Sequence, residues 1–184
     1  MTIRRLTPAD YVRMPWRNGG GTTTELVVEP QTSDLATGRF LYRLSIADVA
    51  SDGPFSRFPG YDRHIMLLSG AGMTLDCGAD GTIELAAPRV ARAFSGDQDV
   101  RGSLAAGAVR DLNLIVDRAR ARGSLEATAV AGSARWDVPG GSILLVHVLS
   151  GALDVAAEGE TLVADEPLAA EGRAEVVLGR IRPV

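Results

Sequence analysis

The sequence predicts an all-β protein made of two similar units within 184 residues. Three observations support this class. Short segments alternate apolar with polar residues, glycine-containing turns separate these segments, and one pattern of strands and turns occurs twice, about 80 residues apart. A chain of this length buries roughly 70% of the surface that its unfolded form exposes, so its core needs no disulfide or metal for stability.

The predicted strands are short segments with the period-two alternation of half-buried strands. They are residues 22–29, 40–49, 64–69, 73–77, 109–116, 143–149 and 174–181. Hairpin turns are expected at 69–72, 78–81 and 157–160, because each contains glycine, which reaches positive φ at little cost. The segment 117–131 is rich in Ala and Arg and is the one candidate helix. Gly123 and Ser124 interrupt it, so we expect a connection between two halves.

The internal repeat aligns residues 67–88 with residues 147–167. Each copy contains an apolar strand, a Ser-Gly turn, an alternating strand, a second turn and a proline. This pattern resembles the cupin superfamily and implies a bicupin, with two small jelly-roll-like antiparallel β-barrels packed together as one compact unit. The expected halves are 1–118 and 119–184. Taken alone, the repeat fits an antiparallel sandwich equally well.

Composition excludes several classes of chemistry. All 19 cationic residues are arginines, so lysine-dependent catalysis has no candidate residue. The single Cys77 cannot form a disulfide within the chain. The formal net charge of -4 argues against nucleic-acid binding. The N-terminal segment has no secretory signal and no stretch is long enough to span a membrane, so we expect a cytoplasmic protein with no membrane partner.

Metal and nucleophile motifs are missing. Many cupins bind a metal through an H-x-H pair, a Glu and a later His, whereas Asp62, Arg63 and His64 stand at the corresponding place here. His64 and His147 both lie in apolar strands, which favours hydrogen-bonded, partly buried histidines over metal ligands. Cys77 is expected to be an inert core thiol. We therefore predict neither a metal nor a cofactor.

Two predicted strands carry unusual polar faces. Phe40, Tyr42, Leu44 and Ile46 share one face of the first, opposite Arg43 and Ser45. Leu112, Leu114 and Val116 likewise share a face opposite Asp111 and Asn113. The polar faces are directed either to solvent or into a barrel, where they would line a ligand cavity. An arginine in such a cavity can bind a carboxylate through two parallel hydrogen bonds.

Two turn-rich segments, 14–25 and 52–63, precede predicted strands. Three consecutive glycines in the first indicate a tight bend, a close backbone approach or an anion-binding nest of amides. The alternative is a flexible turn with Trp16 as a core residue. In the second segment, Asp62 and Arg63 at a strand entrance are either site residues or a weak surface ion pair.

The motifs WRNGGGTTTE, YRLSIADV, DGPFSRFPGYDR, HIMLLSGAGMTL, FSGD and VRDLNLIVDR resemble the HutD/Ves family of bicupin proteins, over residues 11–118. The resemblance implies a metal-free homodimer in the cytoplasm that senses or limits histidine catabolism by binding a small anionic metabolite, such as formylglutamate or urocanate. Ligand-binding roles are expected for the matched polar positions, namely Trp16, Asn18, Gly19, Gly20, Thr22, Glu25, Arg43, Ser45, Ser56, Asp62, Arg63, Asp111 and Asn113.

Two function classes compete. The first is a binding protein in which Arg43 or Arg63 pairs with a carboxylate. The second is a metal-independent isomerase or hydrolase that uses Asp111 or Glu25 as a general base. The absence of an evident nucleophile, metal set or histidine pair favours binding. A purely structural interaction protein is a third class, and it predicts no enclosed polar cavity.

Overall fold

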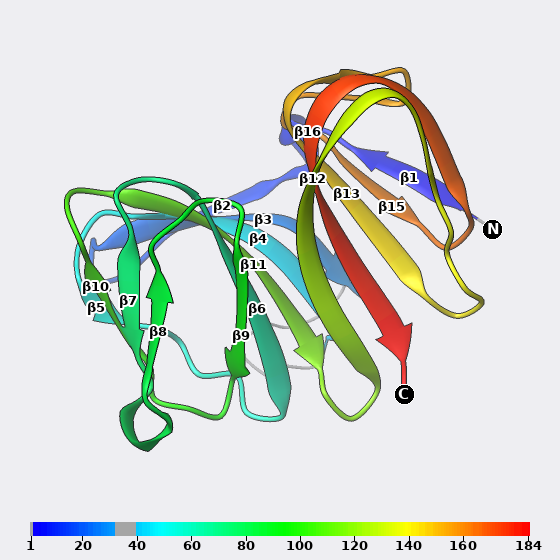
Figure 1. The fold of residues 1–184 in the computed structure, drawn as a ribbon. Helices are drawn as coiled ribbons and strands as arrows, with labels where there is room; N and C mark the ends of the chain where they lie inside the picture. The colour runs from blue at the N-terminus through cyan, green and yellow to red at the C-terminus, as the bar shows by residue number, and fades with distance from the viewer. Residues whose placement is uncertain (1, 32–39) are drawn as a thin grey trace.

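The computed structural model describes residues 2–31 and 40–184, and within these ranges the chain forms three antiparallel β-sheets (Figure 1). The all-β prediction is confirmed. Among the described residues, the pairings of strands give three sheets and no closed ring. Their helices are two short 3-10 turns, η1 (Pro8–Asp10) and η2 (Gly78–Asp80). None of the described helices is long and apolar enough to cross a membrane.

The large N-terminal sheet has six strands in the order β2-β3-β4-β11-β6-β9. Its strands are β2 (Val12–Pro15), β3 (Gly21–Glu29), β4 (Tyr42–Val49), β11 (Val109–Asp117), β6 (Tyr61–Ser69) and β9 (Ala91–Ser95). A small sheet in the order β5-β10-β7-β8 belongs to the same half. It contains β5 (Gly53–Pro54), β10 (Arg101–Leu104), β7 (Met73–Asp76) and β8 (Thr82–Leu85).

The C-terminal sheet has the order β1-β15-β13-β16-β12, with β14 paired to β13. Its strands are β1 (Ile3–Leu6), β15 (Thr161–Ala164), β13 (Ile143–Leu153), β16 (Leu168–Pro183), β12 (Ala121–Trp136) and β14 (Ala156–Ala157). The first strand of the chain thus pairs with β15, far away in sequence. The expected boundary between residues 118 and 119 falls in the turn that connects β11 to β12.

The two faces of the large sheet have different roles. The apolar face, with Leu44, Leu112 and Leu114, shares one hydrophobic cluster with Leu145 and Val177 of the C-terminal sheet. This face is the seam between the halves, which Figure 1 shows side by side. The opposite face packs partly against the small sheet, in a cluster that includes residues of β6, β7 and β8. The rest of that face carries the polar side chains singled out above.

Most sequence-predicted strands are found within a few residues of their expected bounds. Two expectations are wrong. The segment 117–131 is not only a connection, because residues from Ala121 onward form β12, which pairs with β16 along its whole length. Phe40 does not share the face of Tyr42, because it precedes β4 and packs instead on Tyr61, with ring centroids 4.5 Å apart.

Candidate functional site

A cavity of about 500 Å³ opens over the polar face of the large sheet. Strand register explains its lining, because paired residues of neighbouring strands direct their side chains to the same face. Central β11 pairs with β4 on one side and β6 on the other, which aligns Arg43 and Arg63 with Ile115, Ser45 with Asn113, and Ala47 with Asp111. The expected polar face therefore lines a cavity and is not a solvent face.

Arg63, on strand β6, lines the cavity and is only 6% exposed. Its guanidinium lies over three aromatic rings, those of Phe55, Phe58 and Phe94, at 4.9 to 5.5 Å from their centroids. Nη1 donates to the Ser56 carbonyl at 2.9 Å, and Nε approaches Asn113 Oδ1 at 3.4 Å. Burial lowers the pKa of Arg63 to about 10, so the side chain stays charged at neutral pH.

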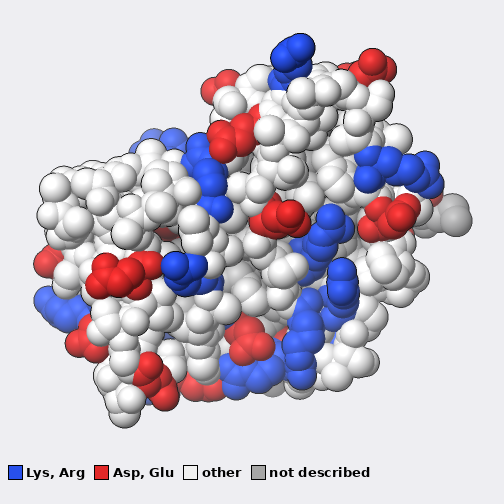
Figure 2. Space-filling view, viewed as in Figure 1, with Lys and Arg blue, Asp and Glu red and all other residues white. Residues whose placement is uncertain are grey.

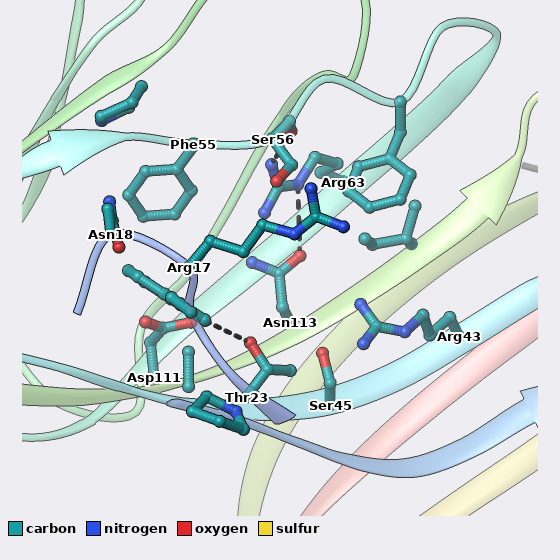
Figure 3. Close-up of a pocket in the computed structure, with 16 residues that line it drawn as sticks. Arg17, Asn18, Thr23, Arg43, Ser45, Phe55, Ser56, Arg63, Asp111 and Asn113 are labelled. Atoms are coloured by element: carbon teal, nitrogen blue, oxygen red, sulfur yellow. Dashed lines mark hydrogen bonds between the residues drawn. The ribbon is translucent and has the colours of Figure 1, made fainter. Parts of the chain in front are cut away.

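Arg43 is the second buried cation of the cavity, and Glu25 holds it in place. Glu25 Oε2 accepts a hydrogen bond from Arg43 Nε at 2.7 Å, and both side chains are about nine-tenths buried. The carboxylate fixes the orientation of the guanidinium from the neighbouring strand β3. In Figure 3, Arg43 and Ser45 lie at one end of the cavity and Asp111 at the other, with Asn113 between them.

Asp111 is fully buried, and neither of its carboxylate oxygens has a hydrogen-bond partner of good geometry among the described residues. Burial raises its pKa to about 7, whereas the charge of Arg63 and the amide of Asn113 act in the opposite direction. Asp48 adds a small repulsion. Unpartnered buried carboxyl groups are rare in proteins and are concentrated at functional sites.

A tight loop at the start of β3 covers one side of the cavity. Trp16 and Gly21 are joined by a backbone hydrogen bond of 2.9 Å, and the Trp16 indole donates to Thr23 at 2.8 Å. Gly21 leaves no room for a side chain, because an added Cβ would lie 2.5 Å from the Asp48 carbonyl and 3.0 Å from the indole. Arg17 extends from this loop toward Arg63 and Asn113 (Figure 3).

The cavity brings together eight of the thirteen residues expected to bind ligand, namely Trp16, Asn18, Arg43, Ser45, Ser56, Arg63, Asp111 and Asn113. Five others do not line it. Glu25 lies behind Arg43. Thr22 and Asp62 are the strand neighbours of cavity residues and therefore point to the opposite face. Asp62 pairs with Arg118 at 2.6 Å.

Gly19 and Gly20 do not form the expected anion nest. The amide of Gly19 donates to the Trp16 carbonyl and that of Gly20 to Asn18 Oδ1, at 3.0 Å each. These bonds close the loop and leave neither amide for a ligand. The glycines therefore shape the cavity wall by keeping the loop tight.

Sequence reasoning missed eight lining residues, namely Pro15, Arg17, Thr23, Ala47, Pro54, Phe55, Phe58 and Ile115. Thr23 and Ala47 could have been found from the same alternation that selected Ser45. Arg17 gave no periodic signal because it lies in a loop. Phe55 and Phe58 contact the Arg63 guanidinium because residues 55–58 fold back over the sheet, which the local sequence pattern does not show.

The described residues contain no group of three His, Cys, Asp or Glu side chains placed to bind a metal ion. His147 is buried and its Nδ1 lies 3.0 Å from the Thr161 hydroxyl, as expected for a structural histidine. His64 packs closely on Gly123, since a Cβ at position 123 would lie 2.9 Å from the His64 imidazole. Cys77 is a free, buried thiol.

Comparison with known proteins assigns the family. The profile of the HutD family matches residues 8–180. The chain belongs to the HutD family. An uncharacterized protein encoded in the region 3′ of hutC in Pseudomonas putida is 44% identical over 67% of this chain. The matched part of the chain spans 63% of the length of that relative. Protein Ves of Cronobacter sakazakii is 36% identical, over 78% of this chain and 76% of its own.

A solved HutD structure supports the same family and its fold. HutD from Pseudomonas fluorescens SBW25, described under a formate condition, is 32% identical, with a TM-score of 0.82 over the full length of both chains. The resemblance to the HutD/Ves family and the cupin-type fold are both confirmed.

Proposed function

We propose that this HutD-family protein binds a small carboxylate metabolite in the N-terminal cavity and thereby senses or limits histidine catabolism in the cytoplasm. The observation that carries the proposal is Arg63. It is buried, charged and held by a carbonyl, an amide oxygen and aromatic faces, and it forms no ion pair among the described residues. Such a buried cation, with no carboxylate in direct contact, is costly unless an anion binds to it.

The other cavity residues suit the same ligand class. Arg43 and Arg17 add two further cations, and one of the two, Arg43, is oriented by Glu25. Ser45 and Asn113 supply a hydroxyl and an amide between them. Figure 2 shows arginines and acidic residues interspersed on one face of the molecule, and the net charge is -4. The protein as a whole repels anions at long range, so local arginine pairing must provide the affinity.

The descriptions of two relatives guide the choice of compounds to test. The Pseudomonas putida relative is described by its position beside hutC, and the Pseudomonas fluorescens HutD structure by a formate condition. Formate is the smallest carboxylate. These descriptions concern those proteins, and they favour formylglutamate or urocanate as the first compounds to test here.

Calorimetric titration with formylglutamate, urocanate, glutamate and histidine tests the proposal. A charged hydrogen bond contributes about 1.5 to 3 kcal/mol, so Arg63→Ala and Arg43→Ala should each weaken binding at least about tenfold. Arg57→Ala is the matched control, because that side chain is half exposed and pairs only loosely with Asp99 at 3.5 Å. If both cavity variants bind as tightly as Arg57→Ala, or if none of these carboxylates binds, the proposal is overturned.

A second candidate function is a metal-independent isomerase or hydrolase. Asp111 favours it, because a carboxyl with a pKa of about 7 beside arginines matches a general base at neutral pH. Both of its oxygens are shielded from solvent, however, which favours binding over proton transfer to a ligand. Turnover of any of the four compounds that disappears in Asp111→Asn while binding persists would establish the enzyme instead.

A further inference from the structure

Asp111 lies in the same cavity as the buried arginines but forms no ion pair with them among the described residues. Its side chain is fully buried, and both oxygens lack a hydrogen-bond partner among the described residues. Arg43 already has a carboxylate, because Glu25 accepts its Nε hydrogen bond. The Arg63 guanidinium donates to the Ser56 carbonyl and to Asn113 Oδ1, and not to Asp111. Among the described residues, the Asp111 carboxyl therefore interacts with the arginines through the electric field and not through ion pairs, and the Asn113 amide favours its ionised form.

The charged side chains around the cavity that contains Asp111 come from strands β3, β4 and β6 and from the loop before β3. Strand β6 supplies Arg63, and β4 supplies Arg43 on the cavity side and Asp48 on the far side. Strand β3 supplies Glu25, and the loop before it supplies Arg17. In this set Arg63 favours the ionised carboxyl, whereas Asp48 disfavours it.

We propose that the anion site takes up its ligand together with a proton, and that Asp111 is the residue that holds this proton. This inference rests on the proposed function. A carboxylate bound to Arg63 cancels the positive field that keeps Asp111 ionised and adds a negative charge near it. Water does not reach the Asp111 oxygens, so little screening weakens this repulsion. Protonation of Asp111 removes this repulsion.

The sign of the pH dependence follows from this coupling. The ligand raises the pKa of Asp111 above its value in the free protein, about 7, so affinity is highest at low pH. As the pH rises above about 7, affinity falls by up to about tenfold per pH unit. It becomes constant again above the pKa of the complex.

Calorimetric titration between about pH 5.5 and pH 9 is the test, with N-formylglutamate and formate as probes. Both probes stay fully ionised over this range, so their own titration does not contribute. Repeating the titration near pH 8 in two buffers of different ionisation enthalpy counts the protons taken up. We expect uptake approaching one proton per ligand near pH 8, and almost none near pH 5.5, where Asp111 is already protonated.

Asp111→Asn should remove both the pH dependence and the proton uptake, and should bind at pH 8 about as tightly as the wild type does at pH 6. The exposed residue Asp99 provides the control, since Asp99→Asn should retain both effects. The proton count in the wild type tests the inference even if Asp111→Asn fails to fold.

The outcomes separate the two proposals. Binding that depends on Arg43 but is independent of pH, or a proton uptake that persists in Asp111→Asn, overturns this inference and leaves the carboxylate-binding function intact. If neither probe nor any of the other carboxylates named above binds at any pH, the function and this inference are overturned together.

Discussion

Replacing Asp111 with Asn should stabilise the folded protein at alkaline pH and leave acid stability almost unchanged. The carboxyl is fully buried, and burial raises its pKa from 3.8 to about 7. A raised carboxyl pKa means that the folded state binds the proton more tightly than the unfolded state. Stability from this residue is therefore present below about pH 4 and is lost as the pH rises to about 7.

The magnitude follows from the shift. About three pKa units at 1.36 kcal/mol each correspond to a destabilisation of roughly 4 kcal/mol above pH 7. This is a large part of the 5 to 15 kcal/mol by which folded proteins are typically stable. Asparagine has the same shape and no charge, so its own burial cost is constant with pH. The difference between variant and wild type should grow by about 1.4 kcal/mol per pH unit between pH 4 and 7.

Urea unfolding at pH 5, 6, 7 and 8 measures this difference. Subtracting the wild type removes the opposite contribution of surface carboxyls such as Asp97, whose pKa is lowered to about 2 by Arg118. Asp99→Asn, at an exposed position, should show no such slope. If Asp111→Asn changes stability equally at every pH, the carboxyl has the same protonation state throughout, and the reasoning fails.

Four further predictions concern other parts of the chain. Gly21→Ala places a Cβ 2.5 Å from the Asp48 carbonyl, so it should cost about 1 to 3 kcal/mol in urea unfolding and shift the tryptophan fluorescence. Arg89 and Glu175 join the two halves through bonds of 2.6 and 3.1 Å, and a double-mutant cycle should give a coupling of about 0.5 to 1 kcal/mol that weakens with salt. Burial lowers the pKa of His147 to about 4, so wild-type stability should fall as the pH drops from about 6.5 to 4, and His147→Gln should lose this dependence. Elemental analysis should find no stoichiometric metal, whereas zinc, iron, nickel or manganese whose removal abolishes ligand binding would contradict the binding site described above.

The sequence by itself determined the strands and the two faces of each one. Alternation places Leu112 and Leu114 opposite Asp111 and Asn113 whatever the fold, because successive side chains of a strand point to opposite sides. The long motifs also determined the family. Local pattern could not say what covers each face, since a strand facing solvent and a strand facing a cavity have the same alternation.

Only the tertiary structure decided which polar residues meet. Register across β4, β11 and β6 aligned Arg43 and Arg63 on either side of Ile115, one alternation from Asn113. Residues 55–58 fold back over the sheet and place two aromatic rings against the Arg63 guanidinium. The same packing shields the Asp111 oxygens from water, which raises the pKa of Asp111 to about 7. These are long-range effects. Burial and electrostatic fields depend on segments that are distant in sequence, so no window of the chain contains them.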